Sequence, residues 1–151
     1  FIMEYGHLFY VQVIANYIKE KYSNKKFYWM SDLKEHENVP MTSIPNPRKP
    51  PPLLIKRPDL IAEERSNSNI YIMGEAKTYS DFLKDDKRKN SQIDYYLNYL
   101  KNKPSGLLIY SLPHTLRGEA NRLINQKKEE WNLPNIKFIV ITDLDYTKSY
   151  F

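Results

Sequence analysis

Residues 57–77 read RPDLIAEERSNSNIYIMGEAK, and this stretch decides how the chain is interpreted. Two segments rich in strand-forming residues, one after Asp59 and one at residues 70–77, flank a polar cluster at residues 64–69. Clusters of Ser and Asn between such segments are typical of chain reversals. The stretch therefore predicts two antiparallel strands joined by a hairpin.

The alternation of side chains along a strand groups three charged residues. Glu75 and Lys77 fall on the same face of the second strand. An antiparallel hairpin places Asp59, at the start of the first strand, opposite the end of the second and beside Glu75. Two carboxylates and one amine are thus predicted to converge. The intervening positions of the second strand point to the other face: Ile72, Gly74 and Ala76.

This combination fits hydrolysis at a divalent metal ion. Carboxylate oxygens such as those of Asp59 and Glu75 bind Mg²⁺, which takes further ligands from water and substrate phosphate. A neighbouring lysine, here Lys77, can position the attacking water and offset charge on phosphorus. A surface Glu/Lys pair on an ordinary hairpin remains the alternative.

Pro58-Asp59 followed by Glu75-Ala76-Lys77 resembles the signature of the PD-(D/E)xK nucleases, which include restriction endonucleases, Holliday-junction resolvases and many repair nucleases. The resemblance implies a restriction-endonuclease-like core and a DNA substrate. It implies Mg²⁺ as cofactor, with Mn²⁺ as a substitute, and the backbone carbonyl of Ala76 as a further metal ligand. It also implies cleavage that leaves a 5′-phosphate.

The first helix is predicted at residues 3–22, with an apolar face of Leu8, Val11, Ala15, Ile18 and Tyr22. Glu4 lies one turn before Leu8 on that face. In the resembled family an acidic residue of the first helix often joins the metal site, so Glu4 is the candidate. The alternative is a first-turn glutamate favoured by the helix dipole. His7 is expected to flank the groove or lie at the surface.

A second helix is predicted from Ser91, with Ile93, Leu97 and Leu100 as its apolar face. Gln92 lies beside that face in the first turn, aimed at the end of the strand that carries Glu75. Branches of the resembled family, including the virus-type replication-repair nucleases, carry a similar glutamine. A solvent-exposed glutamine is the alternative. Residues 81–89, which are charged, are expected to form a turn or loop.

The remaining elements complete an α/β pattern. Residues 27–30 predict a short first strand, and residues 106–112 and 136–142 predict two buried strands. A helix at residues 115–131 joins the last two, which predicts a parallel crossover. The order is α, β, β, β, α, β, α, β. We therefore expect a mixed central sheet flanked by helices, which matches the core of the resembled fold.

Proline interrupts this pattern between the first two strands. Seven of the 10 prolines fall between Pro40 and Pro58, so residues 37–56 are predicted to be an extended excursion. The excursion is either a nucleic-acid-binding arm or an insertion with solvated charges. The basic residues that we expect at nucleic acid lie here and in the charged segment after Lys77: Arg48, Lys49, Lys56, Arg57, Lys87 and Arg88.

Composition sets broad limits. A chain of 151 residues is most simply one domain, and its net charge of +5 modestly favours polyanionic partners. The absence of cysteine excludes disulfides, zinc–thiolate sites and thiol nucleophiles, and fits a cytoplasmic location. No apolar run approaches 18 residues, so no membrane span is expected. The chain begins with Phe1, which leaves open that it is part of a longer protein. A homodimer is a separate open alternative, because one metal site cuts one strand and cleavage of a duplex would need two copies.

The sequence as a whole predicts a Mg²⁺-dependent deoxyribonuclease, most simply an endonuclease. Asp59, Glu75 and Lys77 form its catalytic centre, and Glu4 and Gln92 support it. A non-catalytic nucleic-acid-binding or assembly module on the same fold is the alternative. A nucleotide-binding α/β domain is a weaker rival, because only 4 glycines occur and none forms a phosphate-binding loop.

Overall fold

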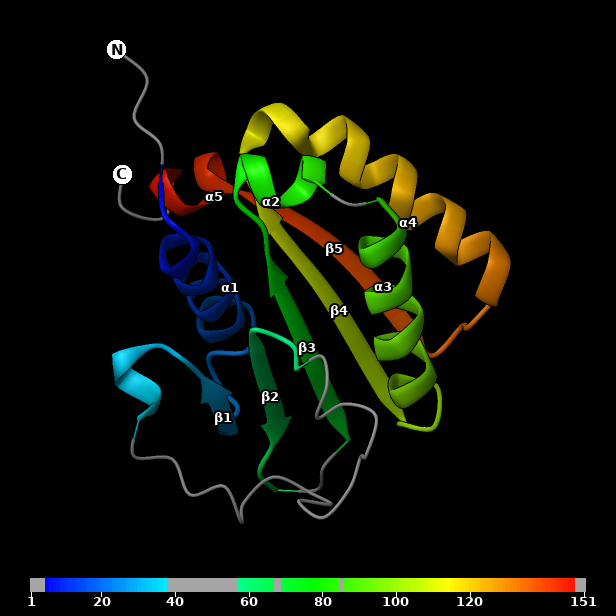
Figure 1. The fold of residues 1–151 in the computed structure, drawn as a ribbon. Helices are drawn as coiled ribbons and strands as arrows, with labels where there is room; N and C mark the ends of the chain where they lie inside the picture. Colours follow the sequence, from blue (N-terminus) through cyan, green and yellow to red (C-terminus); the bar gives the residue numbers. More distant parts are fainter. Residues whose placement is uncertain (1–4, 38–56, 67–68, 85, 149–151) are drawn as a thin grey trace.

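The computed structural model of this chain describes residues 5–37, 57–66, 69–84 and 86–148. It is an α/β structure in which a five-stranded mixed sheet is flanked by helices (Figure 1), as the sequence predicts. The strands, in their order across the sheet, are β1 (Phe27–Ser31), β2 (Leu60–Glu64), β3 (Ile70–Ala76), β4 (Ser105–Leu112) and β5 (Ile136–Thr142). The α-helices are α1 (His7–Lys21), α2 (Tyr79–Lys84), α3 (Asp86–Leu100), α4 (Arg117–Trp131) and α5 (Asp143–Lys148).

The sheet changes direction at β3. β1, β2 and β3 pair antiparallel, whereas β3, β4 and β5 pair parallel, the last two across the predicted α4 crossover. Leu60 of β2 pairs with Gly74 of β3, so the residue before Leu60 lies at the level of the residue after Gly74. Those residues are Asp59 and Glu75. The predicted register of the hairpin is confirmed.

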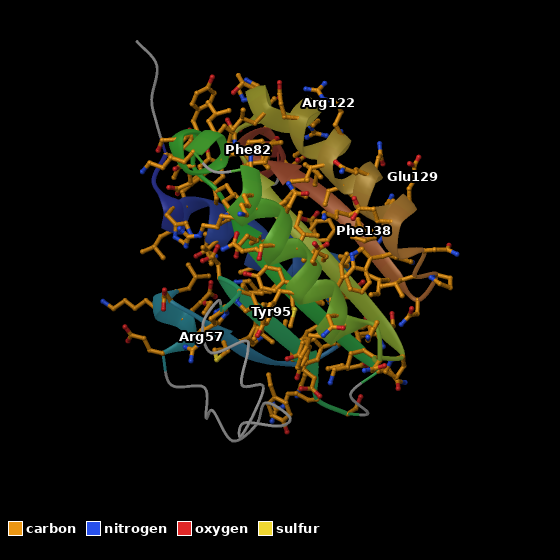
Figure 2. All side chains as sticks on the ribbon, turned by 45° about the vertical axis from the view of Figure 1, so that its right-hand side comes forward. Arg57, Phe82, Tyr95, Arg122, Glu129 and Phe138 are labelled. Atoms are coloured by element: carbon orange, nitrogen blue, oxygen red, sulfur yellow. The ribbon has the colours of Figure 1, made fainter. Side chains whose placement is uncertain are left out.

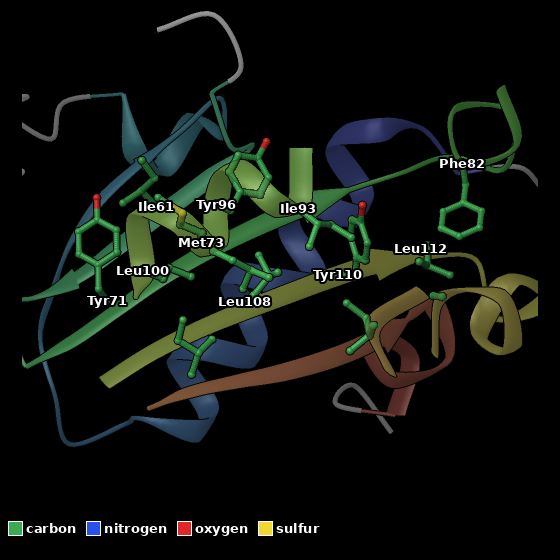
Figure 3. Close-up of a cluster of buried hydrophobic side chains, with 14 of the residues drawn as sticks. Ile61, Tyr71, Met73, Phe82, Ile93, Tyr96, Leu100, Leu108, Tyr110 and Leu112 are labelled. Carbon is green, nitrogen blue, oxygen red and sulfur yellow. The ribbon is translucent and has the colours of Figure 1, made fainter. Parts of the chain in front are cut away.

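Helices cover both faces of the sheet. α1 packs on one face, and α3 and α4 pack on the other (Figure 1). β3 contributes side chains to the hydrophobic clusters on both faces of the sheet, because successive side chains point to opposite faces. Ile72 and Ala76 join the cluster under α1, whereas Tyr71 and Met73 join the cluster under α3 and α4. Figure 3 shows the second cluster, where Met73 lies among side chains from α3 and β4.

Several sequence expectations need correction. α1 begins at His7 rather than at residue 3, and Leu8, predicted to face the core, is 52% exposed. β5 is an edge strand whose central residues are only half-buried, because no strand of the described ranges pairs with its outer side. α3 begins at Asp86, five residues before the predicted Ser91.

Two short helices occupy segments where no helix was predicted. α2 lies in the expected charged loop, and its Phe82 is buried while the side chain of Thr78 accepts a hydrogen bond from the N–H of Asp81. α5 follows β5 directly. There the side chain of Asp145 accepts a hydrogen bond from the N–H of Thr142 at 2.8 Å, and the side chain of Thr142 accepts one from the N–H of Leu144. Together these two hydrogen bonds form a capping box.

The outer face of α4 carries exposed charged side chains. Arg122 and Glu129 point outward from α4 (Figure 2). Among the described residues, no helix is both long and apolar enough to cross a membrane. Glu4 and residues 38–56, nearly all of the predicted Pro-rich excursion, lie outside the described ranges.

Gly74 allows α1 to approach the sheet closely, which generates a stability prediction. A Cβ atom at this position would lie 2.9 Å from Cγ2 of Ile14 and 3.5 Å from Cβ of Leu60. Ile14 is fully buried, so Gly74→Val should force α1 away from β3 and lower the free energy of unfolding by about 1–3 kcal/mol. Urea denaturation measures this change.

Gly118 provides the matched control. It lies in α4, and a Cβ atom there would meet nothing within 4 Å. Gly118→Ala should therefore raise the free energy of unfolding by about 0.5–1 kcal/mol. Equal stability of Gly74→Val and the wild-type protein would show that α1 does not depend on this close approach.

Candidate functional site

A cleft of about 410 Å³ opens at the end of β3, where the chain also enters β2 and α1. Asp59, Glu75 and Lys77 line it, as does Ala76. His7 contributes from the first residue of α1. The far side belongs to α2 and α3, which provide Asp81, Lys84, Arg88 and Lys89. Strand ends and helix ends thus meet at one place.

Asp59 is held by two hydrogen bonds. Its Oδ2 accepts the backbone N–H of Ala76 at 2.8 Å, and its Oδ1 lies 3.2 Å from Nε2 of His7. Burial alone would raise the pKa of Asp59, but the hydrogen bonds from His7 and Ala76 outweigh burial and hold the pKa below its ordinary value. The hydrogen bond to Asp59 in turn raises the pKa of His7, against the opposing effect of burial. Asp59 is therefore a fixed, ionised carboxylate.

Glu75 has a different environment. It is 3% exposed, and the hydroxyl of Tyr96 donates to its Oε1 at 3.3 Å. Burial raises the pKa of Glu75 to about 8, and the neighbouring charge of Asp59 contributes in the same direction, while Lys77 opposes both. Two adjacent carboxylates in a buried place do not both ionise easily. Without a cation, the pair therefore holds one proton near neutral pH.

Lys77 links β3 to α3. Its Nζ lies 3.2 Å from Oε2 of Glu75 and donates to Oε1 of Gln92 at 2.9 Å. Its backbone N–H donates to the carbonyl of Ser111 at 2.9 Å, which continues the pairing with β4 past the last residue of β3. Lys77 and Gln92 are both buried. The ammonium group is thus fixed at both the backbone and the side chain.

The α2–α3 side of the cleft is basic. Lys84 and Arg88 are exposed and line the cleft. Lys89 is buried, where its Nζ donates to the carbonyl of Phe82 and lies 3.7 Å from the centre of the Phe82 ring. Lys87, predicted together with Arg88 to contact nucleic acid, is not among the lining residues of this cleft and lies beside a separate hollow with Trp131.

The structure brings together the predicted catalytic residues that it describes. Asp59, Glu75, Lys77 and Gln92 meet as predicted, and Ala76 lies between them. Arg57 is described as an exposed residue two positions before Asp59. The remaining predicted site residues lie outside the described ranges: Glu4, Arg48, Lys49 and Lys56.

Sequence reasoning missed two residues of the site. His7 is predicted only to flank the groove, yet it contacts Asp59. Tyr96 is not predicted as a site residue, yet it contacts Glu75. A signal for Tyr96 was present, because it follows Gln92 by four positions and therefore lies on the same face of α3. No comparable signal marked His7, since its partner comes from a different element.

Asp59, Glu75 and the carbonyl of Ala76 are the groups here that could hold a divalent cation. Within the described part of the chain, no group of three or more His, Asp and Glu side chains is arranged to hold a metal ion. A cation at the two carboxylates would therefore need backbone, water or substrate oxygens as well.

Comparison of the chain with protein-family models, with curated proteins and with solved structures gives no significant match. The functional argument accordingly depends on the residues of the site themselves.

The raised pKa of Glu75 generates a prediction about stability and pH. In the folded protein the pKa is about 8, against an ordinary value of 4.5. The stability that protonated Glu75 contributes is complete below about pH 4.5 and is lost as the pH rises through about 8. Glu75→Gln keeps a neutral group of the same shape. Its free energy of unfolding relative to wild type should rise from pH 5 to pH 8 and then level off.

Urea denaturation at pH 5, 7 and 9 in metal-free buffer measures this difference. Glu35→Gln is the matched control, because Glu35 is exposed and its hydrogen bonds to Lys19 and Gln12 outweigh burial and lower its pKa. Its difference from wild type should stay constant over this range. If the Glu75→Gln and wild-type curves run parallel from pH 5 to pH 9, the carboxyl of Glu75 is ionised throughout.

Proposed function

We propose that this chain is a metal-dependent nuclease that hydrolyses DNA phosphodiester bonds. The observation that carries the proposal is the meeting of Asp59, Glu75 and Lys77 in one cleft beside the cations of Lys84 and Arg88. Structural ion pairs rarely require two adjacent carboxylates, one of them buried with a strongly raised pKa, whereas catalytic sites often do. The proposal draws further support from the resemblance of Pro58-Asp59 and Glu75-Ala76-Lys77 to the PD-(D/E)xK signature.

The donor set suits Mg²⁺. Asp59 and Glu75 offer hard oxygen ligands. Burial is the largest cause of the raised pKa of Glu75, and repulsion from the charge of Asp59 is the second. A divalent cation would offset that repulsion and displace the shared proton. Bound at these oxygens, Mg²⁺ would supply charge compensation for a phosphate and a more acidic water. We propose that Mn²⁺ can bind at the same oxygens in place of Mg²⁺.

The chain's own residues would divide the remaining work. Tyr96 and His7 hold Glu75 and Asp59 in place through the contacts at 3.3 Å and 3.2 Å. Lys77, fixed by Gln92, presents an ammonium group next to Glu75 that can orient the attacking water and stabilise charge on the phosphate. Lys84 and Arg88 would attract the substrate backbone.

The rival is a nucleic-acid-binding or assembly module without catalysis. It requires a basic surface but gives no reason to bury Glu75 beside Asp59, which costs stability as the pH rises. We therefore favour the enzyme. One such site cuts one strand, so cleavage of both strands of a duplex would require a second copy of the chain or further domains. We propose a homodimer and additional domains as the two candidate partners.

The roles within the triplet can be separated by metal binding and cleavage. Asp59→Ala and Glu75→Ala should weaken Mg²⁺ binding and abolish cleavage together, because each removes a negative ligand. Lys77→Met should leave Mg²⁺ affinity unchanged or slightly higher, while cleavage falls by about 10²-fold or more. Calorimetric titration with Mg²⁺ measures the affinity. A time course on duplex, branched and single-stranded DNA, with Mg²⁺, Mn²⁺ or chelator, measures cleavage.

Matched controls come from surface charges outside the cleft. Glu119→Ala and Lys137→Met remove one acid and one base from α4 and β5, where both side chains are exposed, and should change neither quantity. Full activity of Lys77→Met would remove the lysine from the mechanism. Full activity of Asp59→Ala or Glu75→Ala would overturn the nuclease proposal.

A further inference from the structure

β5 ends the sheet on one side and offers backbone groups to a further strand. Within the described ranges it pairs only with β4. The N–H of Gly106 in β4 donates to the carbonyl of Asn135 at 3.0 Å, so the backbone groups of Asn135 face β4. Backbone groups of successive residues point to alternate sides of a strand. Those of Lys137, Ile139 and Ile141 therefore face β4 as well, and those of the even-numbered residues face outward.

The N–H groups at the two ends of this outward row are already bonded. The N–H of Ile136 donates to a carbonyl of the loop before β5 at 3.2 Å, and the N–H of Thr142 donates to the side chain of Asp145 at 2.8 Å. Phe138 and Val140 lie between these ends. Among the described residues, nothing bonds to their N–H or C=O groups. The edge is therefore open over these two residues.

The side chains of β5 also favour a partner strand. Its 7 residues contain one charge, at Lys137, and neither proline nor glycine. The large apolar side chains of Phe138, Ile139 and Val140 are only half-buried. Edge strands that remain single are usually short, or carry several charges, a proline or a bulge. β5 has a single charge and none of the other features, so a partner strand would cover apolar surface that is otherwise prone to aggregation.

We propose that β5 pairs antiparallel with β5 of a second copy of this chain, so that the two copies share one continuous sheet. In the register centred on Ile139, Phe138 of one copy lies opposite Val140 of the other. Each copy supplies two N–H and two C=O groups, which gives four hydrogen bonds about a two-fold axis. Ile139 faces its own counterpart, and Lys137 faces Ile141 rather than a second lysine.

A second copy fits this edge better than an unrelated extended peptide. Phe138 and Val140 pack on the α3–α4 side of the sheet and Ile139 packs on the α1 side, so a second β5 brings matching apolar side chains to both faces. A single peptide strand would only move the open edge outward by one strand. A two-fold pair uses the open edge of both copies, which ends the assembly at a dimer.

The proposed interface lies away from the candidate site. β4 separates β5 from β3, and no residue of β5 lines the cleft. Antiparallel pairing would direct the carboxyl ends of β3 in the two copies, and with them the two clefts, to opposite ends of the joined sheet. The interface gives a surface to the homodimer of the proposed function, and it rests on that function for the purpose of the dimer only. The pairing itself requires neither metal nor cleavage.

Substitutions at Ile139 test the register by charge. Ile139→Lys and Ile139→Glu each place like charges directly opposite one another, which disfavours strand pairing. In metal-free buffer, sedimentation equilibrium should show a dimer for the wild-type protein and a monomer for each variant at the same concentration. An equimolar mixture of the two variants should form a dimer again, because unlike charges then face one another. This recovery would also exclude unfolding as the cause of either monomer.

A single cysteine tests the register by distance, because the chain has none of its own. The backbone groups of Ile139 face β4, so it would face its counterpart as a non-hydrogen-bonded pair, with Cα atoms about 4.5 Å apart. A disulfide spans that separation. Ile139→Cys should therefore form a covalent dimer on mild oxidation. Lys137→Cys is the matched control, because it is exposed on the same face but would lie about 14 Å from its counterpart along the strands.

Hydrogen exchange tests the same pairing at the backbone. The N–H groups of Phe138 and Val140 should be protected in the wild-type dimer and should exchange rapidly in Ile139→Lys. The N–H groups of Lys137 and Ile141 face β4 and should be protected in both proteins.

Three results would overturn the proposal. They are a wild-type protein that stays monomeric up to its solubility limit, a dimer that persists in both Ile139→Lys and Ile139→Glu, and cross-linking of Lys137→Cys at least as fast as that of Ile139→Cys. None of these experiments measures metal binding or cleavage, so any of these results would leave the nuclease proposal intact. Conversely, loss of the nuclease proposal would leave the dimer measurements unchanged.

Discussion

The antiparallel register of β2 and β3 is the constraint on which the candidate site depends. Pairing of Leu60 with Gly74 brings Asp59 to the end of β3, where the N–H of Ala76 donates to it at 2.8 Å. A shift of one residue would turn Glu75 to the α1 face and separate the carboxylates. Burial on both faces of β3 opposes such a shift, because each face packs in its own hydrophobic cluster. The core therefore maintains the geometry of the cleft.

The same register places an electrostatic cost inside the protein. Asp59 is stabilised as an anion by hydrogen bonds, so the repulsion between the carboxylates and the cost of burial fall on Glu75, whose pKa rises to about 8. Tyr96, Gln92 and Lys77 hold that residue in a fixed position rather than relieve the cost entirely. A site that stores repulsion between fixed acids is suited to a divalent cation, and this is the physical basis of the proposed nuclease.

α1 links the candidate site to the hydrophobic core. Its first residue, His7, contacts Asp59. Its buried residues pack on the sheet, and Gly74 leaves room there for Ile14. The close packing of α1 therefore holds His7 in place beside Asp59.

The sequence by itself determined the strands, the hairpin, the α/β class and the meeting of Asp59, Glu75, Lys77 and Gln92, because alternation along a strand and periodicity along a helix are local properties. It carried unused signals for α5 in its capping box and for Tyr96 four positions after Gln92. Only the tertiary structure decided that Leu8 is exposed, that β5 lies at an edge and that His7 reaches Asp59. Each of these depends on contacts between elements distant in sequence, and no local pattern encodes which elements become neighbours.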